Sequence, residues 1–318
     1  MSERHRYHIL MSQNLTTVFG GSGLVGSAIV RALSRRGSEQ VVSPSHRDLD
    51  LTDQSQVREW MASVRPQRIF LVAGTVGGIK ANSTRPAEFL YDNIMIHANV
   101  IDAAYRNGVE KLLYLGSSCI YPKFAPQPIK EEHLLTGVLE PTNESYALAK
   151  ISGIKMCSSY RDQYGCNFIS AMPTNLYGPG DNFDPEGGHV IPALIRKFHS
   201  AKVDKQGFVT AWGTGTPKRE FLHVDDLADA CLFLMDNYYG RQHVNVGSGQ
   251  EVTIRELSEL VRDVVYPECE IRWDADMPDG TPRKLLDSSQ LMSMGWAPTR
   301  ELGPSLKETY EWFVANAM

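Results

Sequence analysis

The sequence predicts an α/β protein with a doubly wound parallel sheet and a smaller C-terminal lobe. Three observations support this class. Short apolar runs alternate with helical patterns, a glycine-rich turn follows the first run, and the alternation breaks down after about residue 173. The 318 residues are 42% hydrophobic and 22% charged, which is an average globular composition in a chain long enough to bury a large core.

The first half of the chain alternates strand and helix. We expect strands over residues 15–19, 41–42, 68–73 and 111–115. We expect helices over residues 24–36, 54–64 and 86–107, two of which stop at a glycine, Gly37 or Gly108. Strands and helices at this spacing predict parallel strands joined by right-handed crossovers.

The second half is less regular. Glycine and proline are frequent over residues 173–219, so we expect loops and short helices there, where ligand sites often lie. A helix capped by Asp225 or Asp226 should follow, then a strand and turn over residues 243–247. A further helix should begin with Thr253 as its cap.

Charge and cysteine usage exclude several classes of protein. Lys plus Arg number 32 and Asp plus Glu 37, so the net charge is −5, which argues against a polybasic protein that binds nucleic acid or a membrane surface. The five cysteines are scattered without a Cys-x-x-Cys pair. We therefore expect neither a disulfide framework nor a metal site, and we expect a reducing, cytoplasmic location.

The N-terminal residues 1–14 have no apolar run of the length that a signal peptide needs. No stretch of the chain reaches the roughly twenty apolar residues of a membrane helix. We expect a disordered extension, and a translation start at Met11 is an equal alternative.

The glycine-rich turn carries the first chemical signal. Gly21-x-Gly23-x-x-Gly26 follows a strand and opens a helix, as in the dinucleotide fingerprint of Rossmann-type sheets. Glycines let the backbone approach a pyrophosphate, and the helix start supplies free N–H groups. An ordinary glycine-rich turn is the alternative. The predicted cofactor contacts here are Gly20, Gly21, Ser22, Gly23, Leu24, Val25 and Gly26.

The end of the second strand bears on the choice between NAD and NADP. NAD sites usually place an acid there for the ribose 2′-hydroxyl, but the first acid of this segment is Asp48. His46 and Arg47 could hold a 2′-phosphate instead, which favours NADP. The alternative is that both are solvated surface residues.

The spacing of a tyrosine and a lysine indicates a pair of residues that could transfer a proton. Tyr146-x-x-x-Lys150 places both side chains on one helix face, where the lysine cation should lower the pKa of the phenol. Ser117 follows the strand over residues 111–115, so it should face the same crevice. A surface-exposed helix start is the alternative for the pair.

These features resemble the extended, nucleotide-sugar-modifying branch of the short-chain dehydrogenase/reductase superfamily. Longer stretches resemble the GDP-L-fucose synthase family: AGTVGGI (73–79), LGSSCIYP (115–122), EPTNESYALAK (140–150), MPTNLYGP (172–179), REFLHVDD (219–226) and DGTPRKLLD (279–287). That family uses NADPH to convert GDP-4-keto-6-deoxy-D-mannose to GDP-L-fucose. It epimerises C3 and C5 and then reduces the C4 ketone.

The resemblance implies roles for individual residues. Ser117, Tyr146 and Lys150 would form the reductase triad, with Cys119 as epimerisation base and His189 as acid. Further cofactor contacts would be Leu115, Gly116, Ser118, Lys150, Pro173, Asn175, Leu176 and His189. Contacts to the sugar nucleotide would be Lys197, Trp212, Arg219, Asp279 and Lys284. The family often has Arg where this chain has Lys197.

The domain division follows from these motifs. Residues 15–172 with about 220–247 should bind NADP, and about 173–219 with 248–318 should form the substrate-binding lobe. The resemblance also implies a homodimer through the long helix over residues 86–107 and the helix that begins near Tyr146. Packing within one subunit would explain their apolar faces equally well.

Three other functions compete with this one. An epimerase or reductase of another GDP-4-keto sugar, such as a GDP-heptose, would use the same residues. A 4,6-dehydratase is disfavoured because that group places acids where Ser118 and Cys119 stand. A non-catalytic NADP-binding sensor would have no need of Tyr146 and Lys150.

Overall fold

The computed structural model describes residues 15–37, 39–184, 188–277 and 279–316, and it confirms the predicted α/β class. The expected N-terminal extension over residues 1–14 lies outside the described residues. Among the helices of the described part, none combines the length and the apolarity needed to cross a membrane.

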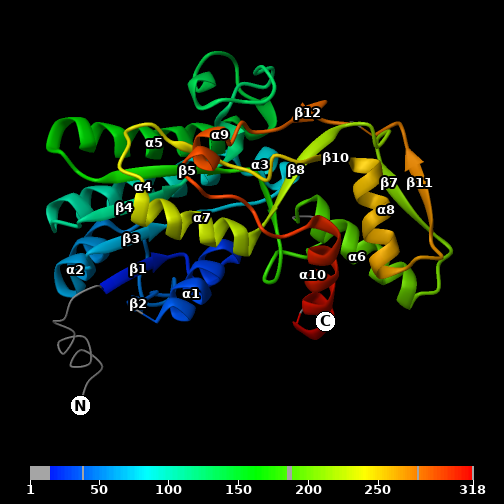
Figure 1. Cartoon of the computed structure of the whole chain (residues 1–318), viewed down its shortest axis with the longest axis horizontal. Coiled ribbons are helices and arrows are strands. Elements are labelled where there is room, and N and C mark those ends of the chain that lie inside the picture. Colours follow the sequence, from blue (N-terminus) through cyan, green and yellow to red (C-terminus); the bar gives the residue numbers. More distant parts are fainter. Residues whose placement is uncertain (1–14, 38, 185–187, 278, 317–318) are drawn as a thin grey trace.

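A six-stranded parallel sheet forms the centre of the larger half of the molecule (Figure 1). Its strands in spatial order are β2 (Gln40–Val42), β1 (Leu15–Phe19), β3 (Arg68–Leu71), β4 (Lys111–Leu115), β5 (Phe168–Pro173) and β9 (Val244–Val246). Every residue of β1, β4 and β5 is buried, because helices cover both faces of the sheet. Because every neighbouring pair of strands is parallel, all six strands point their carboxyl ends toward the same edge of the sheet.

Two helical layers enclose this sheet. On one face α1 (Leu24–Arg36) packs on α7 (Val224–Asn237), and the apolar core beneath them includes Val18 and Phe70. On the other face lie α2 (Gln54–Val64), α4 (Pro86–Arg106) and α5 (Glu144–Tyr164) over a second core. The short helix α9 (Ser289–Ser293) packs beside β9.

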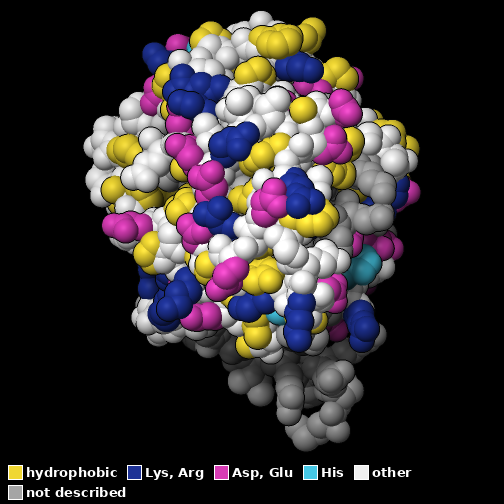
Figure 2. Space-filling view, turned by 90° about the vertical axis from the view of Figure 1, so that its right-hand side faces the viewer, with side chains coloured by type: hydrophobic (Ala, Val, Ile, Leu, Met, Phe, Trp, Pro, Cys, Tyr) yellow, Lys and Arg dark blue, Asp and Glu magenta, His cyan; other side chains and the backbone are white. Residues whose placement is uncertain are grey.

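The smaller lobe has its own core and lies to the right in Figure 1. Its helices are α6 (Val190–Val203), α8 (Ile254–Val265) and α10 (Leu302–Asn316). Its strands are β6 (Asn175–Tyr177), β7 (Phe208–Trp212), β8 (Lys218–His223), β10 (Glu251–Thr253), β11 (Glu270–Asp274) and β12 (Arg283–Lys284). From the lobe side, Figure 2 shows basic and acidic side chains interspersed rather than gathered by sign.

Most predicted elements are confirmed, with small shifts at their ends. The third strand stops at Leu71 rather than residue 73, and α4 ends at Arg106 with Asn107 as its cap. Thr253 caps α8 as predicted, and Glu256 completes a capping box with it.

Two expectations were wrong. Residues 190–203 form a regular helix, α6, although glycine and proline are frequent around it. His223, rather than Asp225 or Asp226, caps α7: its Nδ1 accepts a hydrogen bond from the Asp225 N–H. Both aspartates are held by distant parts of the chain, since Asp225 pairs with Arg31 at 2.8 Å and Asp226 accepts a hydrogen bond from the Thr299 hydroxyl at 2.9 Å.

Candidate active site

A cleft of about 1990 Å³ lies at the carboxyl edge of the large sheet and is walled on its far side by the smaller lobe. Open α/β sheets bind ligands at this edge. Every residue predicted for the site lines the cleft except Gly21 and Arg47. The structure thus brings together residues that are up to 264 positions apart in the sequence, from Gly20 to Lys284.

The glycine loop between β1 and α1 is shaped for close backbone approach. Gly20 has φ +92°, and a Cβ there would lie 2.8 Å from the backbone of Ala73. A Cβ at Gly26 would clash with the carbonyl oxygen of Gly20, and one at Gly21 with Ser43. Gly23 caps α1 without a side-chain hydrogen bond, so the first N–H groups of the helix remain available to a pyrophosphate.

The two residues after β2 that are predicted to bind a 2′-phosphate differ in their position relative to the cleft. His46 lines the cleft, whereas Arg47 is exposed and does not line it. The acids that follow are bound locally: Asp48 accepts from Ser45, and Asp50 accepts from the Thr52 N–H and hydroxyl. Both carboxylates are therefore engaged and are not free to bond the ribose 2′-hydroxyl of NAD. This agrees with a cofactor whose ribose carries a 2′-phosphate.

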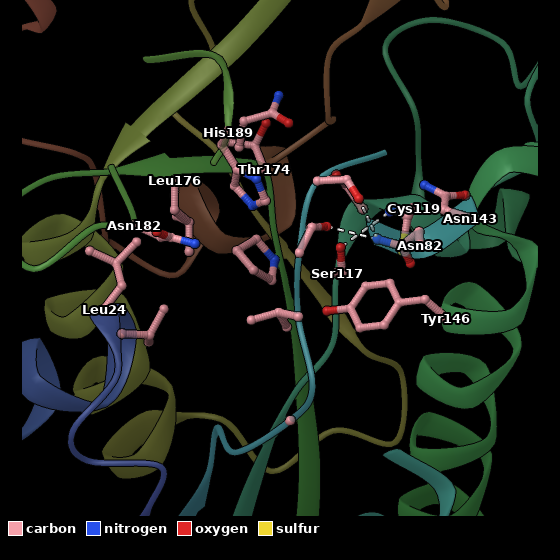
Figure 3. A pocket seen from close by; sticks show the side chains of 18 of the residues that line it. Leu24, Asn82, Ser117, Cys119, Asn143, Tyr146, Thr174, Leu176, Asn182 and His189 are labelled. Carbon is pink, nitrogen blue, oxygen red and sulfur yellow. Dashed lines mark hydrogen bonds between the residues drawn. The ribbon is translucent and has the colours of Figure 1, made fainter. Parts of the chain in front are cut away.

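Ser117, Tyr146 and Lys150 come together as predicted. Ser117 directly follows β4, and the other two lie on the first turns of α5. The Lys150 Nζ donates to the carbonyl oxygen of Leu115 at 3.0 Å and lies 5.7 Å from the centre of the Tyr146 ring. Figure 3 shows the Tyr146 ring reaching from α5 toward Ser117, with which its hydroxyl shares a hydrogen bond.

The predicted lowering of the Tyr146 pKa was wrong. Burial and the nearby Cys119 raise the pKa of the phenol, and the hydrogen bond from Ser117 offsets them only in part. Burial also lowers the pKa of Lys150 to about 8, while its ammonium group is directed to Leu115 rather than to the phenol oxygen. Tyr146 is therefore a neutral phenol at pH 7, the form that can donate a proton.

Cys119 and His189 lie on different sides of the cleft. Cys119 belongs to the short 3₁₀ helix η3 (Ser118–Ile120) and is 8% exposed. His189 caps the start of α6 and is exposed to the cleft. Figure 3 shows His189 near Thr174 and Leu176, across the gap from Cys119 and Tyr146. A flat substrate ring between them would offer opposite faces to the two side chains.

The ionisation of both groups depends on a shared cation. Burial raises the pKa of the Cys119 thiol, while Lys284, a hydrogen bond with Ser117 and Lys150 lower it. Surrounding protein atoms and Lys284 lower the pKa of His189, even though its ring faces the open cleft. At neutral pH the site therefore holds mostly a thiol and a neutral imidazole, and the base and acid forms are minor species.

Three cations from the smaller lobe face the cleft. Lys197 on α6, Arg219 on β8 and Lys284 on β12 form no ion pair among the residues that the structure describes. Lys284 is in register with Arg219, so their backbones lie side by side. Unpaired cations in a cleft suit a diphosphate, and they do so without a basic molecular surface.

Trp212 and Asp279 differ in what they offer a ligand. Trp212 ends β7 with 63% of its surface exposed, and the Lys197 Nζ lies 5.2 Å from its ring centre. Asp279 instead accepts hydrogen bonds from the Thr214 N–H at 2.7 Å and hydroxyl at 2.8 Å. The carboxylate of Asp279 therefore shapes the turn after Trp212, a role that the sequence did not suggest.

Asn82 and Asn143 line the cleft beside these groups, and the sequence analysis did not single them out. Asn82 lies on α3 (Ile79–Thr84) and Asn143 ends the 3₁₀ helix η5 (Pro141–Asn143). Their positions in the sequence could have pointed to both residues. Asn143 falls inside the family-like stretch 140–150, and Asn82 follows the family-like stretch 73–79 by three residues.

Comparison with known proteins places the chain in a family. Residues 16–247 match the NAD dependent epimerase/dehydratase family. GDP-L-fucose synthase 1 of Arabidopsis thaliana is 58% identical over 96% of this chain and 95% of its own. The chain belongs to the GDP-L-fucose synthase family. A second member, GDP-L-fucose synthase of Escherichia coli strain K12, is 50% identical over 96% of this chain and 98% of its own.

Solved structures agree with this family. The NADP-bound GDP-L-fucose synthetase of Naegleria fowleri has a TM-score of 0.90 at 27% identity, covering 97% of this chain and 96% of that one. An NADP-bound GDP-mannoheptose C4 reductase of Campylobacter jejuni has a TM-score of 0.86 at 36% identity, covering 95% and 98%. The heptose enzyme, at 36% identity, is less similar to this chain than the Arabidopsis thaliana and Escherichia coli GDP-L-fucose synthases, at 58% and 50%.

Proposed function

We propose that this chain is an NADP-dependent GDP-L-fucose synthase. It epimerises C3 and C5 of GDP-4-keto-6-deoxy-D-mannose and then reduces the C4 ketone. The observation that carries this proposal is one cleft that holds a hydroxyl pair for a ketone oxygen, a thiol and an imidazole on opposite sides, and three unpaired cations. The identity to GDP-L-fucose synthases supports the hexose over a heptose.

The first step is removal of a proton next to the ketone. Ser117 and Tyr146 hold the C4 oxygen with hydrogen bonds, which stabilise the negative charge that develops there. The Cys119 thiolate takes the proton from C3 or C5, and His189 returns one from the other face of the ring. Lys284 favours the thiolate that this step needs.

The second step is reduction. The cradle at Gly20 and Gly26 fits the diphosphate of NADPH, which supplies the hydride when bound. Tyr146 donates its phenolic proton to the C4 oxygen as the ketone is reduced. The Lys150 cation, close to the ring of Tyr146, stabilises the phenolate that remains.

The substrate lobe holds the GDP part. Lys197, Arg219 and Lys284 neutralise the diphosphate, and the exposed face of Trp212 packs on the base or the ribose. In this division residues 15–172 with about 220–247 bind the cofactor. Residues from about 173–219 and 248–318 close over the sugar nucleotide.

A single assay tests the function. Incubation with GDP-4-keto-6-deoxy-D-mannose and NADPH should consume one NADPH per sugar and yield GDP-L-fucose. An epimerised ketone without NADPH loss indicates an epimerase alone, and cofactor binding without turnover indicates a sensor. Preference for a GDP-4-keto-heptose over the hexose would assign the chain to heptose synthesis.

The cofactor preference has its own test. His46 lines the cleft and Arg47 lies beside it in the sequence, so replacing both with Ala should raise the KM for NADPH far more than the KM for NADH. The single variant His46→Ala should account for most of that rise because Arg47 does not line the cleft. Equal effects on both cofactors would contradict the assignment.

We also infer a cytoplasmic homodimer. The exposed side chains of α4 and α5 include Tyr91, Ile94 and Leu148, which are apolar. α4 and α5 pack side by side over the sheet, so a second copy could cover both at once. Light scattering should give twice the chain mass, and Ile94→Asp should give the monomer. A wild-type monomer at micromolar concentration would contradict the dimer.

A further inference from the structure

Two side-chain amides border the cleft where the sugar ring has to lie. Asn82 and Asn143 come from α3 and η5, two short elements that pack against each other. Figure 3 shows both on the side of the cleft that carries Cys119 and Tyr146. They play no part in the steps described above.

The orientation of the Asn82 amide is fixed by its own surroundings. Its Nδ2 donates to the carbonyl oxygens of Gly77 at 2.7 Å and Gly78 at 3.0 Å. Only the NH₂ end of an amide can donate to a carbonyl, so the Oδ1 is directed away from these glycines. The side chain is 6% exposed, and its Oδ1 has no hydrogen-bond partner.

The Asn143 amide is in a similar state. Its Oδ1 is buried and has no partner either, and the side chain forms no hydrogen bond with any described residue. A buried acceptor without a partner costs about 1–3 kcal/mol, and most buried acceptors in folded proteins are satisfied. Two such oxygens on touching elements at one cleft therefore indicate that a bound ligand completes them.

We propose that the Oδ1 atoms of Asn82 and Asn143 accept hydrogen bonds from hydroxyl groups of the bound hexose. This rests on the proposed function, which supplies the chemistry of the ligand. A 4-keto-6-deoxy-hexose in a GDP-sugar carries hydroxyls at C2 and C3 only, so these are the donors that its ring can offer. The C4 oxygen is held by Ser117 and Tyr146, and C3 is one bond away from C4.

The energetic consequence is selectivity for a hydroxylated ring. Both oxygens are shielded from water, so the amide or its neighbours must shift when a sugar hydroxyl binds, and the bond then satisfies an acceptor that has no partner before binding. The Asn143 amide, unconstrained by other hydrogen bonds of the described chain, can turn to meet the sugar. A site that contains acceptors for a hydroxyl discriminates strongly against a ligand that lacks it.

Calorimetry with two nucleotides tests the proposal without any turnover. For Asn143→Ala, the Kd for GDP-L-fucose should rise about tenfold, the loss expected for one hydrogen bond. The Kd for GDP, which lacks the hexose, and the Kd for NADPH should stay at the wild-type values. Thr142→Ala is the matched control, since Thr142 lies on the same turn and also lines the cleft.

Thermal melting separates this role from a structural one. Asn143→Ala removes an unsatisfied acceptor, so the Tm of the free protein should stay equal or rise while affinity falls. Asn82→Ala should lower the Tm as well, because it loses the bonds to Gly77 and Gly78. Wild-type affinity for GDP-L-fucose in both variants, or an equal loss for GDP, would overturn the proposal.

Turnover then identifies the hydroxyl. The KM of wild type and of Asn143→Ala is measured for the 2-deoxy and the 3-deoxy analogue of the ketone. For the analogue that lacks the hydroxyl bonded to Asn143, the two proteins should have the same KM. A KM penalty that persists with both analogues would also overturn the proposal. Failure of wild type to turn over the ketone would contradict the proposed function alone, because the calorimetric result stands independently.

Discussion

The two walls of the cleft differ in how firmly the protein holds their side chains. The nucleotide wall, which we define as Ser117, Cys119, Tyr146 and Lys150, is buried or half-buried and tied to β4 and α5. The lobe wall, defined as His189, Lys197, Trp212, Arg219 and Lys284, comes from separate strands and helix starts, and Trp212 is 63% exposed.

This difference assigns different tasks to the walls. Proton removal and reduction need atoms held in one geometry, and burial on the nucleotide wall also sets the pKa values of Cys119, Tyr146 and Lys150. Capture of a diphosphate tolerates more movement, because cations attract it over a range of positions. The predictions below separate the tasks.

The largest effect is expected from replacing Cys119, the proposed catalytic base of the nucleotide wall. Cys119→Ser should slow deuterium incorporation at C3 and C5 by about 100-fold or more, because a serine hydroxyl ionises far less readily than a thiol. NMR of the sugar in heavy water measures it. Cys157→Ser, a buried cysteine of α5 outside the cleft, is the control. Wild-type exchange in Cys119→Ser would remove Cys119 from the mechanism.

A second large effect should fall on reduction. Tyr146→Phe should lower the rate of NADPH oxidation about 100-fold, since the proton donor to the C4 oxygen is lost. Deuterium exchange should fall much less because Ser117 still polarises the ketone. Equal losses in both assays would mean that the two steps do not divide between Cys119 and Tyr146.

The pH dependence should differ between the same two steps. The pKa of Lys150 is about 8, so its cation is present below pH 8 and is lost as the pH rises through that value. The kcat/KM for NADPH oxidation should therefore fall up to tenfold per pH unit above about 8. Exchange should persist to higher pH, since the pKa of Cys119 is raised. Parallel declines would contradict this separation.

The smallest effect is expected on the lobe wall. Trp212→Ala should raise the KM for the GDP-sugar about five- to tenfold, roughly the 1 kcal/mol of an exposed stacking and cation–π contact. The Kd for NADPH should not change. Phe208→Ala, at the other end of β7, is the control. Loss of NADPH binding in Trp212→Ala would mean that the walls do not act separately.

The sequence predicted short-range features better than long-range contacts, for a physical reason. The glycine loop, the Tyr146 and Lys150 pair and the Thr253 cap depend on spacings of a few residues, which local geometry fixes. His223 as the cap of α7 was missed because Asp225 is claimed by Arg31, 194 positions away. Such long-range pairing leaves no local pattern.

Burial accounts for the other differences. The raised pKa of Tyr146 follows from its enclosure, which no spacing of residues reveals. The unpartnered oxygens of Asn82 and Asn143 likewise become visible only when the surrounding chain is in place. The residues that α/β packing orders along the sheet edge could be predicted, whereas what each one touches across the cleft could not.

One measurement tests the division most directly. Wild-type protein is incubated with GDP-4-keto-6-deoxy-D-mannose in heavy water without NADPH, and the recovered sugar is analysed by NMR. Because proton removal and return use only Cys119, His189 and the ketone-binding hydroxyls, we predict deuterium at C3 and C5 before any reduction. If no deuterium enters until NADPH is added, epimerisation does not precede reduction and the proposed sequence of steps is wrong.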